Sequence, residues 1–360
     1  MDMKKRILFF AVSLLLLVSC KEDNQVKIGV ILPLTGDVAT YGTSVKEGLD
    51  IAVEEFSENS KYKYKLIYQD SKAQKNPAIN AVEFLSGQGI KFFIGDATST
   101  VTYAIGPKIN SIGGLLVVPI ATGDDILKTP NVFMISPRNE KQTWKIIDFI
   151  RNENINKVGC LFKQNEYGVN IANTFLDSIS TLGIETYSQA YQEGQNEFRS
   201  LLRKFEEREI QTIFVPGNYE ETALILKQSQ ELAQNITFIG TDGCYSPDLI
   251  KLAGSASESF LLTMMPLKKD SELYVKFASL YKDKHGKEPD VFTCYGYETF
   301  SILFNAIENS STLDINNVVS YLENNSFNSL TNTLKFKNRE ADREYQIYKI
   351  ENSNFVPTEK

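Results

Sequence analysis

The sequence predicts an α/β protein built from two doubly wound lobes. Short runs of β-branched and aliphatic residues alternate with stretches of helical periodicity, as expected of parallel sheets covered by helices on both faces. This alternation runs from Val26 to Val118 and starts again near residue 157. After residue 266 the chain is mostly helical and ends in two short strands. Two consecutive units are the simplest architecture for a chain of 360 residues.

In the first unit, strands are expected from their β-branched runs and helices from their apolar spacing. We expect strands at residues 26–32, 65–68, 90–94 and 115–118, and helices at residues 45–56, 77–86 and 99–112. Asn76 and Pro77 are residue types preferred at the N-cap and first position of a helix, and Gly87 is typical of a helix end.

The second unit repeats the pattern, and the tail differs from it. Strands are expected at residues 158–162, 184–190, 212–215 and 237–239, and helices at residues 167–182, 197–207 and 219–233. In the tail we expect helices at residues 272–285, 295–309 and 315–323, and strands at residues 333–336 and 345–350. Residues 338–343 form the polar turn expected between these two strands.

The composition excludes several classes of protein. Hydrophobic residues make up 42% and charged residues 23%, a balance that excludes collagen-like and disordered chains. The formal net charge is -7, so the basic excess of nucleic-acid binders is absent and we expect no nucleic-acid partner. The single histidine, His285, argues against most metal sites and histidine-based catalysis, so we expect no metal and no cofactor.

Residues 1–19 are typical of an export signal. Three basic residues precede an apolar run at residues 7–18, which is shorter than the ~20 residues that a membrane-spanning helix needs. Residues 17–20 resemble a bacterial lipobox, in which the leader is cut before the cysteine and the thiol is lipidated. We therefore expect a lipid anchor on Cys20, a tether over residues 20–25, and a location in the periplasm or at the cell surface.

No arrangement of residues indicates an enzyme. The sequence contains no Gly-x-Ser-x-Gly, P-loop, dinucleotide-binding or His-Glu-x-x-His motif. Adjacent carboxylates such as Asp124 and Asp125 are expected to be solvated charges rather than an acid–base pair. Cys160, Cys244 and Cys294 share no metal-like spacing, so they are either three separate buried residues or one disulfide with a remaining thiol.

Four loops that follow expected strands carry polar residues, and such loops are where open α/β sheets bind ligands. Ser99 and Thr122 follow strands of the first unit, and Tyr167 and Asp242 follow strands of the second. Taken alone, three of them are better explained by local structure, with Ser99 and Thr122 as helix caps and Asp242 in an Asx-turn. Together they place carboxylate-binding hydroxyls opposite a carboxylate, which suits a small zwitterion.

The order and spacing of short motifs resemble a known family. The motifs are Val26-Lys-Ile-Gly-Val-Ile-Leu-Pro-Leu-Thr-Gly36, Ala39-Thr-Tyr-Gly42, Lys46-Glu-Gly48, Lys91-Phe-Phe-Ile-Gly95, Asn165-Glu-Tyr-Gly168, Phe198 and Gly240-Thr-Asp-Gly243. They are similar to those of type I periplasmic solute-binding proteins, above all the branched-chain amino-acid (Leu/Ile/Val) binding proteins of ABC importers. The similarity extends from Val26 to the end and is weakest after Pro266.

The resemblance implies two Rossmann-like lobes joined by a three-segment hinge near Pro137, Pro266 and Leu330. It assigns both short C-terminal strands to the second lobe, so lobe 1 comprises residues 26–137 and 267–330 and lobe 2 comprises residues 138–266 and 331–356. The expected protein is a substrate-binding lipoprotein of an ABC importer. It is a monomer and not an enzyme, and it delivers a small molecule to a membrane permease.

The resemblance also assigns the head group of the ligand. Ser99, Thr122 and the backbone of Ile120 match the family positions that receive the ligand carboxylate. Asp242 matches the acidic residue that binds the α-amino group, although it is one methylene shorter than the usual glutamate. The implied ligand is an amino acid, with the branched-chain amino acids as the first candidates.

Three further matches concern the rest of the pocket. Tyr41 and Tyr167 correspond to aromatic residues that line or cover it, and Asn218 stands where the family often has a tyrosine. Asn218 makes the pocket more polar than one built for leucine alone. Members of the superfamily bind amides, urea or aromatic acids, so a ligand-sensing receptor for such a compound is the alternative function. An amide hydrolase and a structural lipoprotein with an empty cleft are the remaining alternatives.

Overall fold

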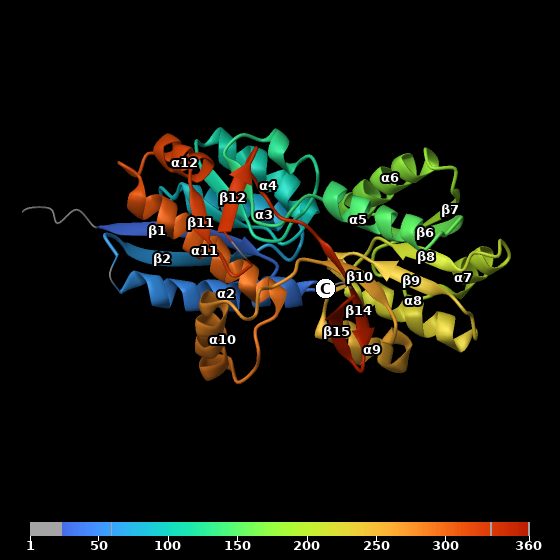
Figure 1. Ribbon diagram of the computed structural model, residues 1–360. Helices are drawn as coiled ribbons and strands as arrows, with labels where there is room; N and C mark the ends of the chain where they lie inside the picture. Colours follow the sequence, from blue (N-terminus) through green and yellow to red (C-terminus); the bar gives the residue numbers. More distant parts are fainter. Residues whose placement is uncertain (1–23, 59, 332, 359–360) are drawn as a thin grey trace, which may run out of the picture.

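The computed structural model describes residues 24–58, 60–331 and 333–358, which form two α/β lobes side by side (Figure 1). Each lobe is built around one mostly parallel sheet with helices on both faces, which confirms the expected fold class. The expectations for residues 1–19 and for Cys20 lie outside the described residues. Within the described ranges, no helix has both the length and the apolar character needed to cross a membrane.

The first lobe contains an eight-stranded sheet in the order β11-β12-β13-β5-β4-β3-β1-β2. Its main strands run parallel: β1 (Gln25–Leu32), β2 (Lys63–Asp70), β3 (Phe92–Gly95), β4 (Leu115–Val118) and β5 (Val132–Met134). Beyond β5 the sheet is extended by β11 (Ser326–Asn328), β12 (Thr333–Lys337) and β13 (Glu340–Ala341). The helices are α2 (Ala39–Ser57), α3 (Lys75–Ser86), α4 (Ser99–Ser111), α10 (Glu272–His285), α11 (Val291–Asn309) and α12 (Ile315–Asn324).

The second lobe contains a seven-stranded sheet in the order β15-β14-β10-β9-β8-β6-β7. Its parallel strands are β6 (Lys157–Lys163), β7 (Glu185–Tyr191), β8 (Thr212–Val215), β9 (Thr237–Gly240) and β10 (Leu261–Met264). Two antiparallel strands follow, β14 (Gln346–Glu351) and β15 (Asn354–Pro357). The helices are α5 (Asn139–Asn152), α6 (Glu166–Ser180), α7 (Arg199–Glu206), α8 (Tyr219–Glu231) and α9 (Pro247–Ala253).

Strand β1 shows why its apolar run is continuous rather than alternating. Val30 and Leu32 belong to the apolar cluster that includes α2 and α11, whereas Ile31 belongs to a separate cluster with α3 and α4. Successive side chains of a strand point to opposite faces, and both faces of this sheet are covered by helices. All residues of β1 from Ile28 to Leu32 are therefore buried.

The third crossing between the lobes was expected near Leu330, and this expectation is wrong. β12 pairs with β11 and β13, and β13 pairs with β5, so residues 333–341 belong to lobe 1 instead of lobe 2. The chain crosses between Ala341 and Gln346, where the sequence predicted a turn between two paired strands. The apolar face of β12 decides the pairing, because Phe336 packs against Phe133 of the first lobe, with ring centroids 5.0 Å apart.

Several element boundaries also differ from the expectations. α2 begins at Ala39 instead of residue 45, and α11 begins at Val291 instead of residue 295. Asp290 caps α11 by accepting a hydrogen bond from the amide of Thr293 at 2.7 Å, a signal that the apolar spacing alone did not reveal. Gln74, and not Asn76, occupies the N-cap position of α3. The sequence analysis did not anticipate β5, β10, β15, α5 or α9.

Helices α2 and α11 lie in close contact, and this contact attaches the C-terminal helices to the first lobe. A Cβ atom on Gly48 would lie 1.9 Å from the carbonyl oxygen of Thr293, and one on Gly296 would lie 2.1 Å from the carbonyl oxygen of Val45. The two helices therefore approach each other through glycines, where no side chain separates the backbones.

Replacing Gly48 with alanine is expected to destabilise the first lobe. The new methyl group would meet backbone atoms of α11, which cannot rotate away, so the free energy of unfolding should fall by about 3 kcal/mol or more. Gly106→Ala is the matched control, because that helical glycine has no atom closer than 3.8 Å to the new Cβ. Urea unfolding of both variants tests the prediction; equal stability of the two would contradict it.

Candidate functional site

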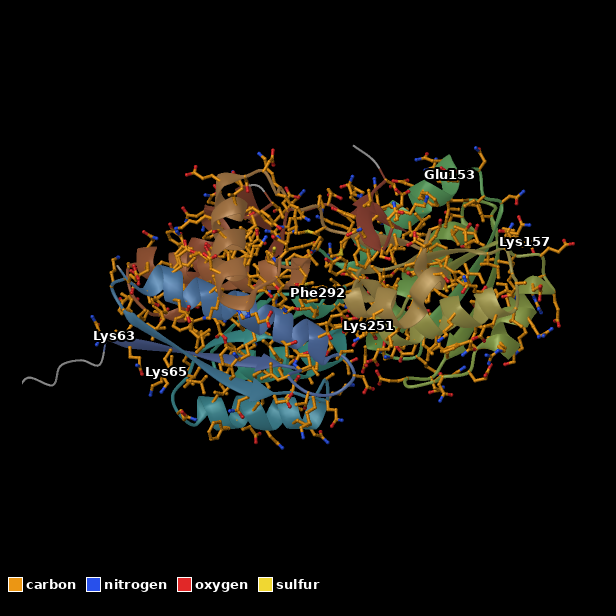
Figure 2. All side chains as sticks on the ribbon, turned by 90° about the horizontal axis from the view of Figure 1, so that it is seen from below. Lys63, Lys65, Glu153, Lys157, Lys251 and Phe292 are labelled. Carbon is orange, nitrogen blue, oxygen red and sulfur yellow. The ribbon has the colours of Figure 1, made fainter. Side chains whose placement is uncertain are left out.

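The carboxyl ends of the two sheets face each other in the middle of the molecule. In Figure 2, Lys63 at the start of β2 and Lys157 at the start of β6 lie at opposite outer ends, and Phe292 lies where the lobes meet. A cavity of about 260 Å³ occupies the space between the lobes. All seven residues expected at a ligand site line it: Tyr41, Ser99, Ile120, Thr122, Tyr167, Asn218 and Asp242.

The first-lobe wall of the cavity carries hydroxyl groups. Ser99 is the first residue of α4 and is buried, and within the described residues its hydroxyl has no hydrogen-bond partner. The side chain of Thr98, not Ser99, accepts the capping bond from the amide of Val101. Ser99 is therefore not the helix cap, and the expectation that capping explains this residue is wrong. The positive end of the α4 dipole lies beside the same wall.

Thr122 and Ile120 follow β4 on the same wall, and both are buried. Thr122 caps none of the helices described, because Asp125 precedes the next one, a short 3₁₀ turn at Ile126–Lys128. Its backbone carbonyl accepts a hydrogen bond from the amide of Asn139 at 2.7 Å, where α5 begins. The hydroxyl wall is thus tied to the first crossing between the lobes.

The second-lobe wall carries the carboxylate of Asp242, which follows β9 and is buried. Its Oδ1 accepts a hydrogen bond from the hydroxyl of Tyr167 at 2.6 Å, and its Oδ2 accepts one from the hydroxyl of Tyr345 at 3.1 Å. Burial raises the pKa of Asp242, while hydrogen bonds from Tyr167, Gln142 and Tyr345 act in the opposite direction. A cation in the cavity would stabilise the ionised carboxylate, which burial disfavours.

Asp242 is connected directly to the segments that cross between the lobes. The hydroxyl of Tyr345, in the third crossing, lies 3.1 Å from Asp242 Oδ2 and 3.1 Å from the carbonyl oxygen of Pro137, in the first crossing. Gln142, at the start of α5, accepts a hydrogen bond from the amide of Asp242 at 3.3 Å and one from the hydroxyl of Thr263 at 2.9 Å. The carboxylate wall and the crossings therefore form one hydrogen-bonded unit.

Aromatic residues close the cavity from both lobes. The hydroxyl of Tyr41 donates to the carbonyl of Gly243 on the opposite lobe, and its ring packs edge-on against Tyr219 and Phe292, with centroids 5.7 and 5.1 Å apart. Asn218 stands at the N-cap position of α8 but makes no capping bond with its side chain.

Polar contacts bridge the lobes on either side of the cavity. Glu166 of the second lobe pairs with Lys75 and accepts a hydrogen bond from the hydroxyl of Thr100 at 2.7 Å. Thr40 lies 3.3 Å from a carboxylate oxygen of Asp248. These contacts hold the lobes together over the cavity, so the structure has the closed arrangement.

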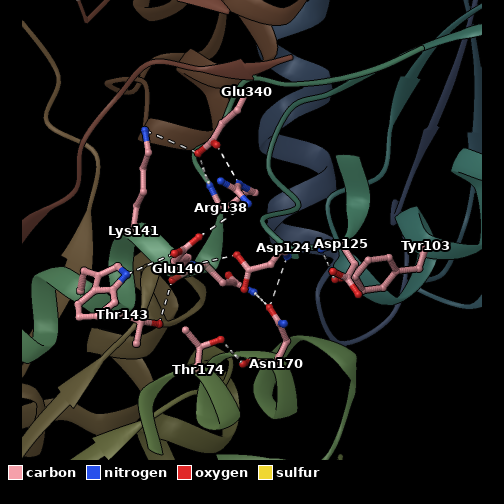
Figure 3. A network of polar contacts seen from close by, with 12 residues as sticks. Tyr103, Asp124, Asp125, Arg138, Glu140, Lys141, Thr143, Asn170, Thr174 and Glu340 are labelled. Atoms are coloured by element: carbon pink, nitrogen blue, oxygen red, sulfur yellow. Dashed lines mark hydrogen bonds and ion pairs between the residues drawn. The ribbon is translucent and has the colours of Figure 1, made fainter. Parts of the chain in front are cut away.

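A second polar network surrounds the first crossing (Figure 3). Arg138 donates its backbone amide and its Nε to the carboxylate of Glu340, at 3.0 and 2.8 Å. Asp124 accepts a hydrogen bond from the amide of Glu140 at 2.9 Å, and Asn170 of α6 lies beside it. Burial raises the pKa of Asp124 to about 6. The sequence analysis treated Asp124 and Asp125 as solvated charges; Asp125 is exposed, whereas Asp124 is partly buried beside α5 and α6.

The structure adds residues that the sequence analysis did not identify. Phe292 was missed because the helix that carries it begins earlier than expected, and Tyr345 because the third crossing was misplaced. Glu193, which also lines the cavity, follows β7 in a loop with no motif of its own. Gln142 was missed as well, because no spacing or motif in the sequence marks it.

The three cysteines in the described part of the chain lie apart from one another. Cys160, Cys244 and Cys294 are free and buried, so they are three separate residues rather than a disulfide with a remaining thiol. Burial raises the pKa of the Cys244 thiol to about 11, which keeps it protonated. No group of three or more His, Cys, Asp or Glu side chains within residues 24–58, 60–331 and 333–358 is arranged to hold a metal ion.

Comparisons with known proteins agree with this arrangement. The family described as periplasmic binding protein matches residues 25–354, so the chain belongs to this family, which is one of solute-binding proteins found in the periplasm. The Leu/Ile/Val-binding protein homolog 2 of Brucella abortus is 27% identical over 319 residues, which are 86% of this chain and 86% of that protein.

Solved structures show the same fold. The leucine-binding protein LivK of Thermotoga maritima has a TM-score of 0.88 and 25% identity, and the match covers 93% of this chain and 98% of that one. A solute-binding protein of Rhodopseudomonas palustris in complex with 3,4-dihydroxy benzoic acid has a TM-score of 0.83 and 18% identity, covering 93% and 96% of the two chains. The expected family is confirmed.

Replacing Asp124 with asparagine is expected to change how stability depends on pH. Its folded pKa of about 6 lies above the ordinary value of 3.8, so the folded state holds this proton more tightly than the unfolded state. The stabilisation from Asp124 is therefore complete at pH below the ordinary value and lost as pH rises through 6. Relative to Asp124→Asn, the wild type should lose about 2 kcal/mol between pH 4 and pH 7.

Urea unfolding of both proteins at several pH values measures this difference. Asp177→Asn is the matched control, because that residue is exposed on α6. Parallel stability curves for the wild type and Asp124→Asn would show that Asp124 titrates at its ordinary pKa.

Proposed function

We propose that the chain is the substrate-binding lipoprotein of an ABC importer and captures a small zwitterionic amino acid between its lobes. The observation that carries this proposal is the pairing of two opposite walls in one cavity. The hydroxyls of Ser99 and Thr122 line the first-lobe wall, and the buried carboxylate of Asp242 lines the second. An amino acid carries one charge for each wall.

The residues of the cavity take separate roles in this proposal. Ser99, Thr122 and the backbone beside Ile120 receive the α-carboxylate, aided by the N-terminal dipole of α4. Asp242 receives the α-ammonium, which compensates the cost of keeping this carboxylate buried. Tyr41 and Tyr167 cover the ligand.

Capture follows from the division of the site between the lobes. Each lobe supplies only half of the partners, so a ligand that contacts both binds the closed arrangement more tightly than an open one. The hydroxyl of Tyr345, which lies 3.1 Å from both Asp242 Oδ2 and the carbonyl oxygen of Pro137, connects this equilibrium to the crossings. The closed form is the state that a membrane permease would recognise, and the protein would act as a monomer.

The names of related proteins support an amino acid as the ligand. The Brucella relative is described as a Leu/Ile/Val-binding protein homolog and the Thermotoga structure as a leucine-binding protein. The alternative is a receptor for an amide, a urea-like compound or a small organic acid, and the Rhodopseudomonas neighbour binds such an acid. Asp242 disfavours an acid without an amine, because two carboxylates would face each other in a buried site.

Removing the acidic wall is expected to abolish tight binding of amino acids. A thermal-shift screen of amino acids, amides and small organic acids on the purified protein identifies the ligand, since a ligand at 100 times its Kd adds about 2.7 kcal/mol of stability. Calorimetry should then show that Asp242→Ala weakens the affinity for an amino acid at least tenfold, because the α-ammonium loses its partner (about 1–3 kcal/mol or more).

Asp177→Ala removes a carboxylate from an exposed position of the same lobe and serves as the control. Unchanged amino-acid affinity in Asp242→Ala would remove the proposed role of this carboxylate. A stabilising organic acid together with no stabilising amino acid would favour the receptor alternative.

Membrane anchoring through Cys20 is expected to depend on its thiol. Cells that express the wild type and are fed a labelled fatty acid should label the protein, and the protein should remain with the membrane fraction. Cys20→Ser should lose the label and leave the membrane fraction. Cys160→Ser is the control, because this thiol is buried; labelling of Cys20→Ser would contradict the anchor.

A further inference from the structure

The cavity extends beyond the residues assigned to the head group of the ligand. Counted away from the crossings, the strand order is β5-β4-β3-β1-β2 in the first sheet and β10-β9-β8-β6-β7 in the second. Ser99, Thr122 and Asp242 follow β3, β4 and β9, which lie toward the crossings. Ala73 and Glu193 follow β2 and β7, the strands farthest from the crossings, and both line the cavity. We call this part the outer end.

The strand order also indicates how far the outer end lies from Asp242. The steps from β9 to β8, from β8 to β6 and from β6 to β7 separate the two loops. Neighbouring strands are about 4.8 Å apart, so the loops after β9 and β7 are on the order of 14 Å apart. A ligand that contacts Asp242 with its α-ammonium needs a long side chain to approach Glu193.

The outer end carries more negative than positive charge. Glu193 and Glu221 both contact the ammonium of Lys163, at 3.0 and 2.9 Å. One lysine is thus shared between two carboxylates, and a single negative charge is left over. Glu221 is buried, and its Oε1 also accepts a hydrogen bond from the amide of Gly194 at 3.2 Å, whereas its Oε2 has no hydrogen-bond partner within the described residues.

Within the described residues, the cavity is lined by three acidic side chains and by no lysine or arginine. Glu166 has Lys75 as its partner, whereas Glu193 shares Lys163 and Asp242 is held by tyrosines. A cleft with this excess of negative charge raises the local concentration of cations. An aliphatic side chain would gain no such attraction, and Glu193 would keep only Lys163 and solvent as its partners.

The residue between the two carboxylates is polar as well. Asn218 follows β8, which lies between β9 and β6 in the sheet, and its side chain makes no capping bond with α8. Asn218 and Gln164 both line the cavity, and the Asn218 side chain interacts with the hydroxyl of Tyr41, so polar residues continue from Asp242 toward the outer end.

We propose that the outer end is a subsite for a cationic group and that the ligand is an α-amino acid with a basic side chain. This inference rests on the proposed function, because Ser99, Thr122 and Asp242 must first hold the head group. The side chain then passes Asn218, and its terminal cation meets Glu193. The cation supplies the positive charge that Lys163 alone does not provide for two carboxylates.

Lysine and norleucine form the sharpest pair of probes. Norleucine has the aliphatic chain of lysine without the terminal ammonium, so the ratio of their affinities isolates the cation. Calorimetry on the purified protein at low ionic strength is expected to show that lysine binds about fivefold more tightly than norleucine, which is the upper range for an ion pair with an exposed carboxylate. Added salt should reduce this preference.

A charge-removing variant assigns the preference to one residue. Glu193→Gln is expected to bring the affinity ratio of lysine to norleucine close to one. The control, Glu207→Gln, makes the same charge change at an exposed position at the end of α7 and should keep the ratio of the wild type. Arginine and citrulline form a second pair that differs in charge at nearly constant length.

The outcomes separate the two proposals. Equal or tighter binding of norleucine in the wild type, or a ratio that Glu193→Gln leaves unchanged, would overturn the cationic subsite while amino-acid binding stands. No binding of any amino acid would contradict the proposed function itself. A preference for lysine that disappears in Glu193→Gln and persists in Glu207→Gln supports the subsite.

Discussion

The site depends on a buried carboxylate, Asp242, whose two oxygens are contacted by tyrosine hydroxyls and, within the described residues, by no lysine or arginine. Burial raises the pKa of Asp242, and the charge is tolerated because Tyr167 and Tyr345 donate hydrogen bonds to its two oxygens. Hydrogen bonds lower the cost of burying a charge but do not supply the opposite charge. In the proposed function the α-ammonium of the ligand supplies that charge, so the cost of burying Asp242 would favour ligands that carry an amine.

In the proposed function the same carboxylate would link the binding of a ligand to the segments that cross between the lobes. Tyr345 lies in the third crossing and also contacts the carbonyl of Pro137 in the first, while Gln142 contacts the backbone of Asp242 just after the first crossing. The hydroxyls of Ser99 and Thr122 belong to the other lobe. A ligand that bridged the two walls would therefore contact residues that are hydrogen-bonded directly to the crossings.

Much of this site could be predicted from the sequence, because loops after parallel strands are local features. Ser99, Thr122, Tyr167 and Asp242 each follow a recognisable strand, and the structure brings them to one cavity. Local spacing does not show which lobe a short strand joins. Strand β12 was assigned to the wrong lobe because its partner Phe133 is about two hundred residues earlier in the chain, and Tyr345 was missed for the same reason.

The sequence by itself determined the alternation of strands and helices, the two units and the chemical types of the head-group residues, since these depend on periodicity and on the residue that follows each strand. Tertiary structure alone decided where the third crossing lies, which tyrosines hold Asp242, and that Glu193 shares Lys163 with Glu221. Those contacts join residues far apart in the chain. They depend on burial and on the packing of two lobes, which no local pattern encodes.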